Sequence, residues 1–303
     1  MRISSGTLQI LHSDLTLIQD RGRAGYAHLG VPVCGAWDAQ KYSLLERLLD
    51  YLDGPAFEIL GGTLTLTSSS DAIIAVVGDA TLSFAGQTFP TEHTWVLPAG
   101  SVLHVTSTGA GPVYLGVAGL LVQPTLGSVS ADIVSRLGPK QVVANDEFKF
   151  EYLAKEDLLG RFVRIGQDHP AILRFIPGPH SEVLLNSKWQ VRLQARSGMR
   201  LAAVVPAKIA PNPAHSLLAS YPTLPGAIQM QSADQLIILG PDSGVTGGYP
   251  VLGVVITTDI PLIARFSVGG FLSLHPCSID EAIDAFNSQD SVAQHSLVKI
   301  NQL

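Results

Sequence analysis

Short apolar or alternating stretches recur along almost the whole chain, separated by glycine, proline, serine and asparagine. The first half contains LQILHS, GTLTLTS, AIIAVVG and SVLHVTS, and the part after residue 170 contains AILRFIPG, WQVRLQA, QLIILG and PVLGVVITT. Strand-length stretches at intervals of roughly 8 to 12 residues are typical of antiparallel sandwiches and barrels. The chain is therefore predicted to be mainly β, without the strand and helix alternation of a parallel α/β sheet.

Two segments interrupt this rhythm with helical signatures. Asp38 is positioned to cap a helix over residues 39–53, which Gly54 and Pro55 would end. One side of that helix is expected to carry Tyr42, Leu45, Leu48, Leu49 and Leu52. Near the other end of the sequence Ser278 and Glu281 form a capping box, and the apolar stripe behind it is Ile279, Ala282, Ile283 and Phe286. Each helix is expected to plug or flank one β unit.

The length of 303 residues predicts two domains, because a single hydrophobic core rarely grows beyond about 250 to 300 residues. The densest charge lies in residues 138–170, and it predicts a boundary near residue 165, with domains 1–165 and 166–303. Charged residues make up only 15% of the chain, against the roughly 25% usual for soluble domains. We therefore expect another chain to cover much of the exterior.

Several classes of protein are excluded or disfavoured by composition. No apolar run approaches the about 18 residues of a membrane helix, and the first residues carry no apolar core or cleavage site of a signal peptide, so a cytoplasmic location without membrane contact is expected. Cys34 and Cys277 are too few for a disulfide framework or a zinc site, and no metal site is predicted. The net charge of −6 excludes a basic surface for nucleic acid.

The segment DRGRAGYAHLGVPVCGAWD, residues 20–38, stands out as a glycine-rich loop crowded with polar side chains. Arg21 and Arg23 could hold a carboxylate or phosphate, His28 could move a proton, and Asp20 or Asp38 could orient either. A structural alternative remains open, in which Asp38 caps a helix, His28 bonds a carbonyl and the arginines pair with Asp20. Cys34 lacks an identifiable base and is expected to be a buried small hydrophobe.

Two further clusters carry polar groups. The loop GPDSGVTGGYP, residues 240–250, could form an anion nest with hydroxyls from Thr246 and Tyr249, although a plain turn between strands explains it almost as well. The stretches 174–182 and 195–201 supply Arg174, His180, Glu182, Arg196 and Arg200. These side chains suit a recognition loop for an acidic group or, equally, a solvated barrel rim.

The loop at residues 20–38 resembles the signature D-x-G-R-x-G-Y-x-H-x-G-V-P-x-S-G-A-x-D of the family that includes allophanate hydrolase subunit 2, KipA and the C subunit of 5-oxoprolinase. Further blocks of that family have similar counterparts in the same order: FEILGGTLTL, YLGVAG with LGS, RFIPGPH, PGAIQM and PDSGVTGGYP. The resemblance covers nearly the whole chain. It implies two cyclophilin-like β-barrel domains with one or two short helices each.

The resemblance also implies a function and partners. Members pair with a KipI-like B subunit; with the A subunit of 5-oxoprolinase they make an ATP-dependent enzyme that opens 5-oxoproline to glutamate. ATP with magnesium is then a substrate of the assembled complex, and no organic cofactor is bound in this chain. Other members are described as non-catalytic KipA proteins that antagonise a KipI-like kinase inhibitor. A third interpretation, a carboxyltransferase domain that receives biotin from another protein, is weaker.

Carried over by the resemblance, the catalytic candidates are Arg23, His28, Asp38 and Tyr249. The candidates for substrate or nucleotide binding are Asp20, Gln229, Thr246, Gly247 and Gly248. An arginine for the substrate carboxylate and a glycine-rich nest for a phosphate or lactam oxygen suit ATP-coupled ring opening. The sequence departs from the family at Cys34, where serine is usual, and at Trp37, His180, Ala195 and Tyr221. The two acidic residues lost at Ala195 and Tyr221 favour a regulatory protein, whereas the preserved loops favour the enzyme subunit.

Overall fold

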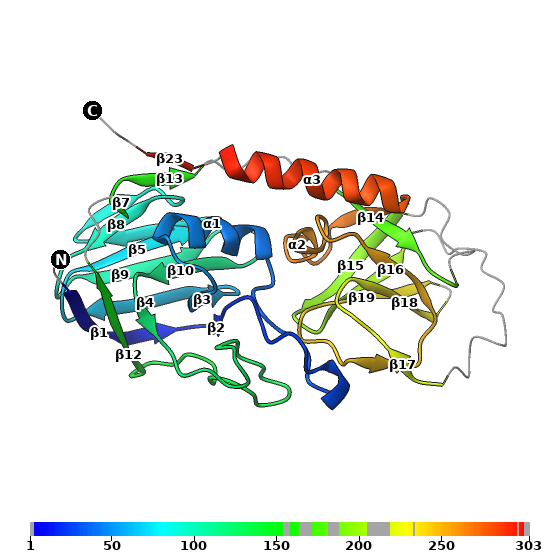
Figure 1. Cartoon of the computed structure of the whole chain (residues 1–303), viewed down its shortest axis with the longest axis horizontal. Helices are drawn as coiled ribbons and strands as arrows, with labels where there is room; N and C mark the ends of the chain where they lie inside the picture. The colour runs from blue at the N-terminus through cyan, green and yellow to red at the C-terminus, as the bar shows by residue number, and fades with distance from the viewer. Residues whose placement is uncertain are drawn as a thin grey trace. The chain divides into compact units, whose positions relative to one another are not determined.

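The structure is a computed structural model, and it describes residues 3–153, 158–163, 171–180, 188–204, 219–232, 234–295 and 297–299. The chain divides into two compact units, drawn in Figure 1. The N-terminal unit comprises Met1–Arg23, Asp38–Ile165 and Ala293–Leu303, and the C-terminal unit comprises Ala24–Trp37 and Gly166–Val292. Strands dominate both units, which confirms the prediction of a mainly β fold.

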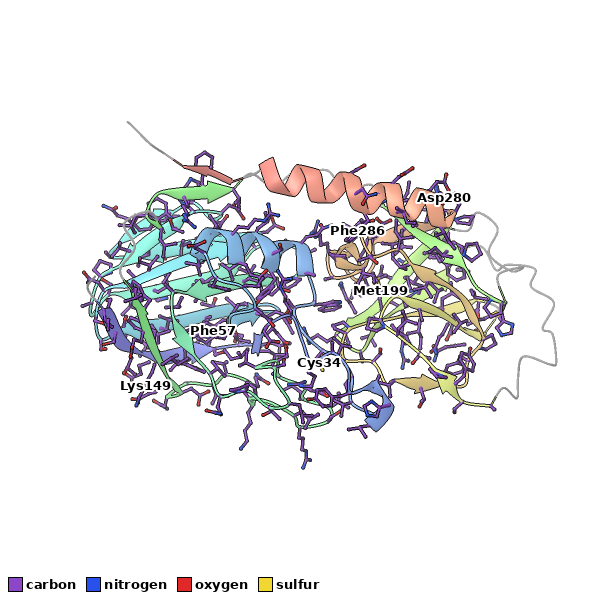
Figure 2. The ribbon with its side chains drawn as sticks, viewed as in Figure 1. Cys34, Phe57, Lys149, Met199, Asp280 and Phe286 are labelled. Atoms are coloured by element: carbon purple, nitrogen blue, oxygen red, sulfur yellow. The ribbon has the colours of Figure 1, made fainter. Side chains whose placement is uncertain are left out.

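The N-terminal unit consists of two antiparallel sheets that enclose one hydrophobic core, in which Phe57 is fully buried (Figure 2). The larger sheet has the order β11-β12-β1-β4-β9-β6-β7, with bounds Leu120–Leu121, Glu147–Leu153, Ile3–Ser13, Thr63–Ser68, Val102–Ser107, Ala80–Phe84 and Gln87–Phe89. The smaller has the order β2-β3-β10-β5-β8, with bounds Thr16–Gln19, Ala56–Ile59, Val113–Val117, Ala72–Val77 and Thr94–Leu97. A separate ribbon pairs β13, Arg161–Val163, with β23, Leu297–Lys299.

Strand β5 shows how the sequence places the helix of this unit. Its residues AIIAVV are all buried, because one face lies on the core and helix α1, Ala39–Leu49, packs on the other face of the sheet (Figure 1). Gly116 of β10 allows this close packing, since a Cβ there would lie 2.5 Å from Leu49 Cδ1. The side chain of Asp38 caps α1 as predicted, accepting from Lys41 N at 3.1 Å.

The end of α1 differs from the prediction. The helix was expected to continue to residue 53, but it ends at Leu49, because Asp50 adopts a left-handed backbone conformation with φ 54°. The backbone N–H of Asp50 donates back to Glu46 O, so the turn that ends the helix satisfies one of its last carbonyls. Leu52 therefore lies outside the helix and is exposed.

The C-terminal unit contains a closed barrel with the order β14-β21-β18-β19-β16-β15-β22. The bounds are Ile172–Pro177, Val251–Val255, Ala227–Ser232, Gln235–Leu239, Gly198–Ala203, Lys188–Ala195 and Phe271–Pro276. Strand β14 closes it by pairing antiparallel with β21 and parallel with β22, which leaves no free edge. The barrel core contains Met199, labelled in Figure 2, and Trp189. The short helix α2, Ile260–Ile263, adds Leu262 and Ile263 to it.

Three small elements complete this unit. The short helix η1, Ala27–Leu29, lies in the glycine-rich loop. Strands β17, Tyr221–Pro222, and β20, Thr246–Gly247, form a two-residue ribbon. Helix α3, Ile279–His295, begins at the predicted capping box, but its apolar residues Ile279, Ile283 and Phe286 are exposed on the described part of the helix.

The capping box of α3 gives a prediction about pH. Glu281 Oε2 accepts from Ser278 N at 2.7 Å and from Ser278 Oγ at 3.0 Å, and these bonds lower the pKa of Glu281. A lowered pKa means that the cap is intact above the ordinary glutamate pKa and is lost as the pH falls through the lowered value. An NMR titration of the Glu281 carboxyl should show this lowered pKa. In Ser278→Ala the pKa should rise part of the way to its ordinary value, and an unchanged pKa would contradict the proposed bonding.

Candidate functional site

The predicted loop at residues 20–38 is divided between the two units. Asp20, Arg23 and Asp38 belong to the N-terminal unit, whereas residues 24–37, which include His28, belong to the C-terminal unit. Gln229 and the segment 246–249 also lie in the C-terminal unit. The candidate residues therefore form two groups, one in each unit.

Asp20 organises the N-terminal group. Its buried carboxylate accepts from Gly22 N at 2.8 Å, from Ser128 Oγ at 2.7 Å, from Ser130 Oγ at 2.5 Å and from Val129 N at 2.6 Å. These four donors occupy the lone pairs that a carboxylate offers. Asp20 therefore positions the extended segment 128–130, which we call the serine strap, beside the end of β2.

Arg23 extends from the same turn, and its side chain is 2% exposed. Its Nη2 donates to the carbonyl of Ser130, on the serine strap. Its Nε and Nη1 are buried and have no hydrogen-bond partner among the described residues. No described carboxylate forms an ion pair with Arg23 either, so the suggested pairing with Asp20 is not made.

Arg21 has a structural partner that the sequence did not indicate. Its Nε donates to Glu46 Oε1 at 3.0 Å and its Nη2 to Glu46 Oε2 at 2.6 Å, a forked pair with a carboxylate on α1. Hydrogen bonding to Glu46 raises the pKa of Arg21. Because Asp53 N also donates to Glu46 Oε1 at 2.6 Å, this glutamate ties the loop and the end of the helix together.

Asp38 is fully buried at the start of α1. Besides capping the helix, it donates its backbone N–H to Tyr114 Oη at 2.8 Å, and that hydroxyl donates to Glu58 Oε2 at 2.6 Å. Burial raises the pKa of Tyr114 well above its ordinary value, so the phenol keeps its proton. Asp38 therefore belongs to a buried hydrogen-bond network with Tyr114 and Glu58.

His28 lies in η1 and is exposed. Among the described residues no group forms a hydrogen bond or ion pair with its imidazole, so the structural alternative of a bond to a carbonyl is not found. Gly30 ends the short helix in a left-handed conformation with φ 82°, and its N–H donates to Ala27 O. The imidazole is thus available to solvent and to a ligand.

Arg196, at the turn between β15 and β16, holds the glycine-rich loop on the barrel. It donates to both carboxylate oxygens of Asp242 at 2.7 Å, and its Nη2 donates to Gly35 O at 2.8 Å. Cys34 N also donates to Pro241 O at 3.1 Å, and Cys34 is buried as expected. The guanidinium of Arg196, suggested as a recognition group for an external acid, is therefore already paired with the carboxylate of Asp242.

Arg174, on β14, is likewise paired with a carboxylate of the same unit. Its Nε and Nη2 donate to Asp259 at 3.0 Å and 2.6 Å. Arg200 is exposed, and Glu182 lies outside the described residues. The arginines of these two stretches thus serve mainly the barrel itself.

Gln229 and Gly247 are brought together in the C-terminal unit. Gln229, on β18, is 4% exposed, and its Nε2 has no hydrogen-bond partner among the described residues. A Cβ on Gly247 would lie 2.7 Å from that nitrogen, so only glycine leaves the present space above the amide. The result is a buried N–H donor beneath the β17 and β20 ribbon, ready to bond an oxygen acceptor.

The residues around Gly247 are held by the neighbouring turn. Thr223 donates its N–H to Val245 O at 2.9 Å and its hydroxyl to Gly244 O at 2.8 Å, and Tyr221 Oη donates to Tyr249 O. The side chains of Thr246 and Tyr249 are exposed, and Gly248 lies between them. Tyr249 therefore presents its phenol at the surface, two residues after Gly247.

Several residues that build these two groups are not indicated by the sequence patterns. Ser128, Ser130 and Gly138 shape the surroundings of Arg23, and Thr223 and Tyr221 shape those of Gln229. The block LGS, residues 126–128, ends in the first of these serines. The sequence signal for this segment is the spacing of Ser128 and Ser130, because side chains two positions apart in an extended segment point to the same side.

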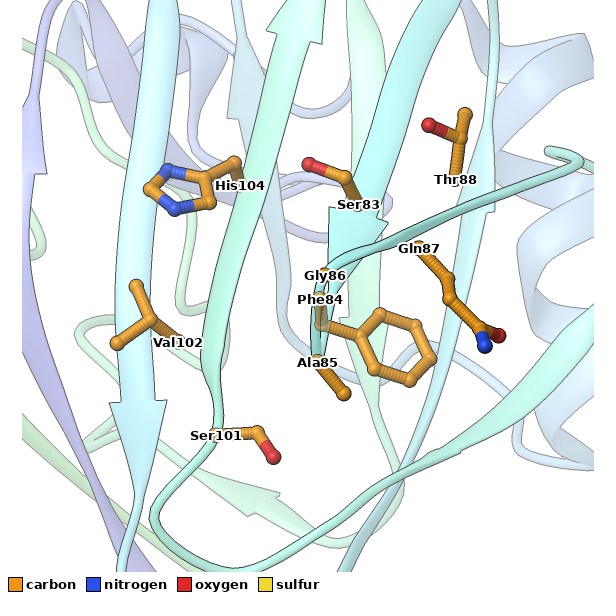
Figure 3. A pocket seen from close by; sticks show the side chains of 9 residues that line it. All are labelled: Ser83, Phe84, Ala85, Gly86, Gln87, Thr88, Ser101, Val102 and His104. Carbon is orange, nitrogen blue, oxygen red and sulfur yellow. The ribbon is translucent and has the colours of Figure 1, made fainter.

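One open groove of about 560 Å³ lies elsewhere in the N-terminal unit, beside the β6 and β7 hairpin (Figure 3). Its lining includes Ser83, Gln87, Thr88 and His104, and none of the predicted site residues. Within the described ranges no three His, Cys, Asp or Glu side chains are arranged to hold a metal ion. None of the described helices is long and apolar enough to cross a membrane.

Comparison with known proteins gives a match to a family model. Residues 29–276 match the model described as "Carboxyltransferase domain, subdomain A and B". The C subunit of 5-oxoprolinase from Escherichia coli K12 is 28% identical over 93% of this chain and 95% of its own length. Urea amidolyase of Saccharomyces cerevisiae is 25% identical over 91% of this chain, which spans 17% of that protein.

A solved structure is similar as well. The crystallised protein TTHA0988 has a TM-score of 0.75 and 28% identity over 90% of this chain. This chain spans 55% of the crystallised one, so the matched fold occupies about half of that longer polypeptide. The similarity extends through both units of the fold.

Proposed function

The chain belongs to the carboxyltransferase domain, subdomain A and B family, and from that membership we propose that it is a subunit of an ATP-dependent amide hydrolase of the 5-oxoprolinase type. The complex would open the ring of 5-oxoproline to give glutamate. ATP with magnesium would be consumed by the assembled complex. The partners would be the KipI-like B subunit of such an enzyme together with its A subunit.

The observation that supports this proposal most directly is the amide of Gln229. A cyclic amide offers a carbonyl oxygen, and the buried Nε2–H of Gln229 is a donor that has no acceptor among the described residues. A donor aimed at that oxygen would stabilise the negative charge that develops on it during ring opening. Admission of the ring requires the two-residue ribbon of β17 and β20 to open above Gln229.

The other candidate residues take supporting roles in this proposal. Tyr249, exposed beside the ribbon, supplies a hydroxyl donor, and His28 transfers a proton. Asp20 and Asp38 hold the two ends of the glycine-rich loop in place through the bonds already described. Gly247 and Gly248 leave room for a ligand to approach the backbone.

The experiment that tests this function is phosphate release by the protein mixed with its candidate A and B partners. Release stimulated by 5-oxoproline is expected, and it should disappear when this chain is omitted. Gln229→Leu should lower stimulated turnover at least tenfold, since a buried donor to the carbonyl is removed. Gln190→Leu, which changes a glutamine on β15 of the same barrel, is the matched control and should turn over normally.

A complex that forms without stimulated release would contradict the enzymatic proposal and favour a regulatory KipA-like protein. One observation bears on that second function. The family's acidic residue before Arg196 is alanine here, yet Arg196 has a carboxylate partner in Asp242. The barrel geometry at this point is therefore kept without the lost acid.

A further inference from the structure

Arg23 carries a buried positive charge that the described protein does not neutralise by direct contact. Its guanidinium has five N–H bonds and, among the described residues, a single acceptor, the carbonyl of Ser130. Nε and Nη1 are both buried and without a partner there. A buried charge that lacks its hydrogen bonds and its counter-ion is strongly unfavourable, so this arrangement calls for an acceptor from outside the described protein.

Ser130 and Gly138 lie close against the guanidinium of Arg23 and restrict its position. The serine strap holds one side through Ser130, and Gly138 lies against it, since a Cβ there would be 3.1 Å from Arg23 Nη2 and 2.3 Å from Ser130 O. The strap itself is fixed by Asp20 through Ser128, Val129 and Ser130. The position of the guanidinium is therefore set before any ligand arrives.

The charges around Arg23 select the kind of ligand. Asp20 accepts a hydrogen bond from the hydroxyl of Ser130, and Arg23 donates a hydrogen bond to the carbonyl of the same residue. The negative charge of Asp20 is therefore separated from Arg23 by one residue, Ser130. Asp132, on the same segment, is buried and its Oδ2 has no partner among the described residues. Because Asp20 and Asp132 already place negative charge on the segments around Arg23, a monoanionic ligand would meet less repulsion there than a phosphate dianion or a triphosphate.

From these contacts we propose that Arg23 binds the carboxylate of a small monoanionic ligand and that nucleotide phosphates do not bind at this position. This inference rests on the proposed function for the identity of the physiological ligand, the carboxylate of 5-oxoproline. It also assigns the two ligands to different components of the complex. This chain binds the carboxylate of the substrate, and another component binds the nucleotide.

The test uses the isolated full chain and needs no turnover. Its thermal unfolding midpoint is measured at constant ionic strength with sodium acetate, 5-oxoproline, inorganic phosphate and ATP. Acetate and 5-oxoproline should raise the midpoint saturably, by about 5 °C at 100 times Kd, because a ligand that binds only the folded state stabilises it. Phosphate and ATP should cause no saturable rise.

Variants separate the Arg23 site from general salt effects. Arg23→Met should abolish the response to both carboxylates, whereas Arg136→Met, which changes an exposed arginine of the same unit, should keep it. If Arg23→Met does not fold, Arg23→Lys replaces it. Lysine keeps the charge but lacks the planar fork, and the carboxylate Kd should rise at least tenfold.

Three outcomes would overturn the inference: no response of the wild type to carboxylates, an unchanged response in Arg23→Met or in the lysine variant, or a larger response to phosphate than to acetate. A failure of the proposed function would give a different experimental result from a failure of this inference. If acetate and 5-oxoproline bind through Arg23 while the mixed proteins release no phosphate, the carboxylate site stands and the hydrolase proposal falls.

Discussion

Replacing Arg196 with leucine is expected to destabilise the C-terminal unit by about 3 to 5 kcal/mol, the usual cost of breaking a buried ion pair from one side. Arg196 and Asp242 are 7% and 8% exposed and are joined by two hydrogen bonds of 2.7 Å. The substitution leaves the Asp242 carboxylate buried without its partner. It also removes the donor to Gly35 O, which holds the glycine-rich loop on the barrel.

The loss is measured by urea unfolding followed through the fluorescence of Trp189, which is buried in the barrel core. Arg200→Leu, on the exposed side of β16, is the control and should change the free energy of unfolding by less than about 0.5 kcal/mol. The double variant Arg196→Leu with Asp242→Leu should recover much of the stability, because neither charge is then left alone. A single variant as stable as the control would show that the pair contributes nothing.

Replacing Gly138 with alanine should destabilise the N-terminal unit by about 3 kcal/mol, the sum of a left-handed backbone penalty and a steric clash. Gly138 has φ +73°, and its new Cβ would lie 2.3 Å from the backbone oxygen of Ser130. Since that oxygen is the acceptor of Arg23, relief of the clash must move the serine strap or the guanidinium. The carboxylate response of Arg23 should weaken along with stability.

Gly127 provides a matched control for the backbone penalty alone. Its φ is +79°, and nothing lies within 4 Å of a Cβ built there. Gly127→Ala should therefore cost only about 1 kcal/mol, the part that comes from the left-handed conformation. Both variants are compared by urea unfolding of the N-terminal unit. Equal losses would mean that the contact with Ser130 is not a clash in solution.

The strand rhythm predicted most of the architecture, because burial dictates residue type locally. The alternating residues of β9, VLHVTS, face the core and the exterior in turn, and the uninterrupted apolar residues of β5 lie between core and helix. Both capping residues, Asp38 and Ser278, bond the backbone donors that the sequence indicated. The end of α1 was missed, because aspartate at position 50 gives little local signal for a left-handed turn.

The partners of the charged residues could not be predicted in the same way. Arg21 bonds Glu46, and Arg196 bonds Asp242, which lies 46 positions away along the chain. Such pairs depend on how the strands are ordered in space, and nearest-neighbour patterns do not carry that information. The sequence therefore marked the polar loop as unusual but did not separate its structural arginine, Arg21, from Arg23, whose Nε and Nη1 have no partner among the described residues.

The order of the segments along the chain also constrains how the molecule is made. Strand β23, residues 297–299, pairs with β13 in the N-terminal unit, while most of the C-terminal unit lies between them in the sequence. On the ribosome this ribbon cannot form until the barrel strands have already emerged, so the first unit to be started is the last to be finished. Until then, β13 would offer an edge that lacks its β23 partner and is open to pairing with other chains.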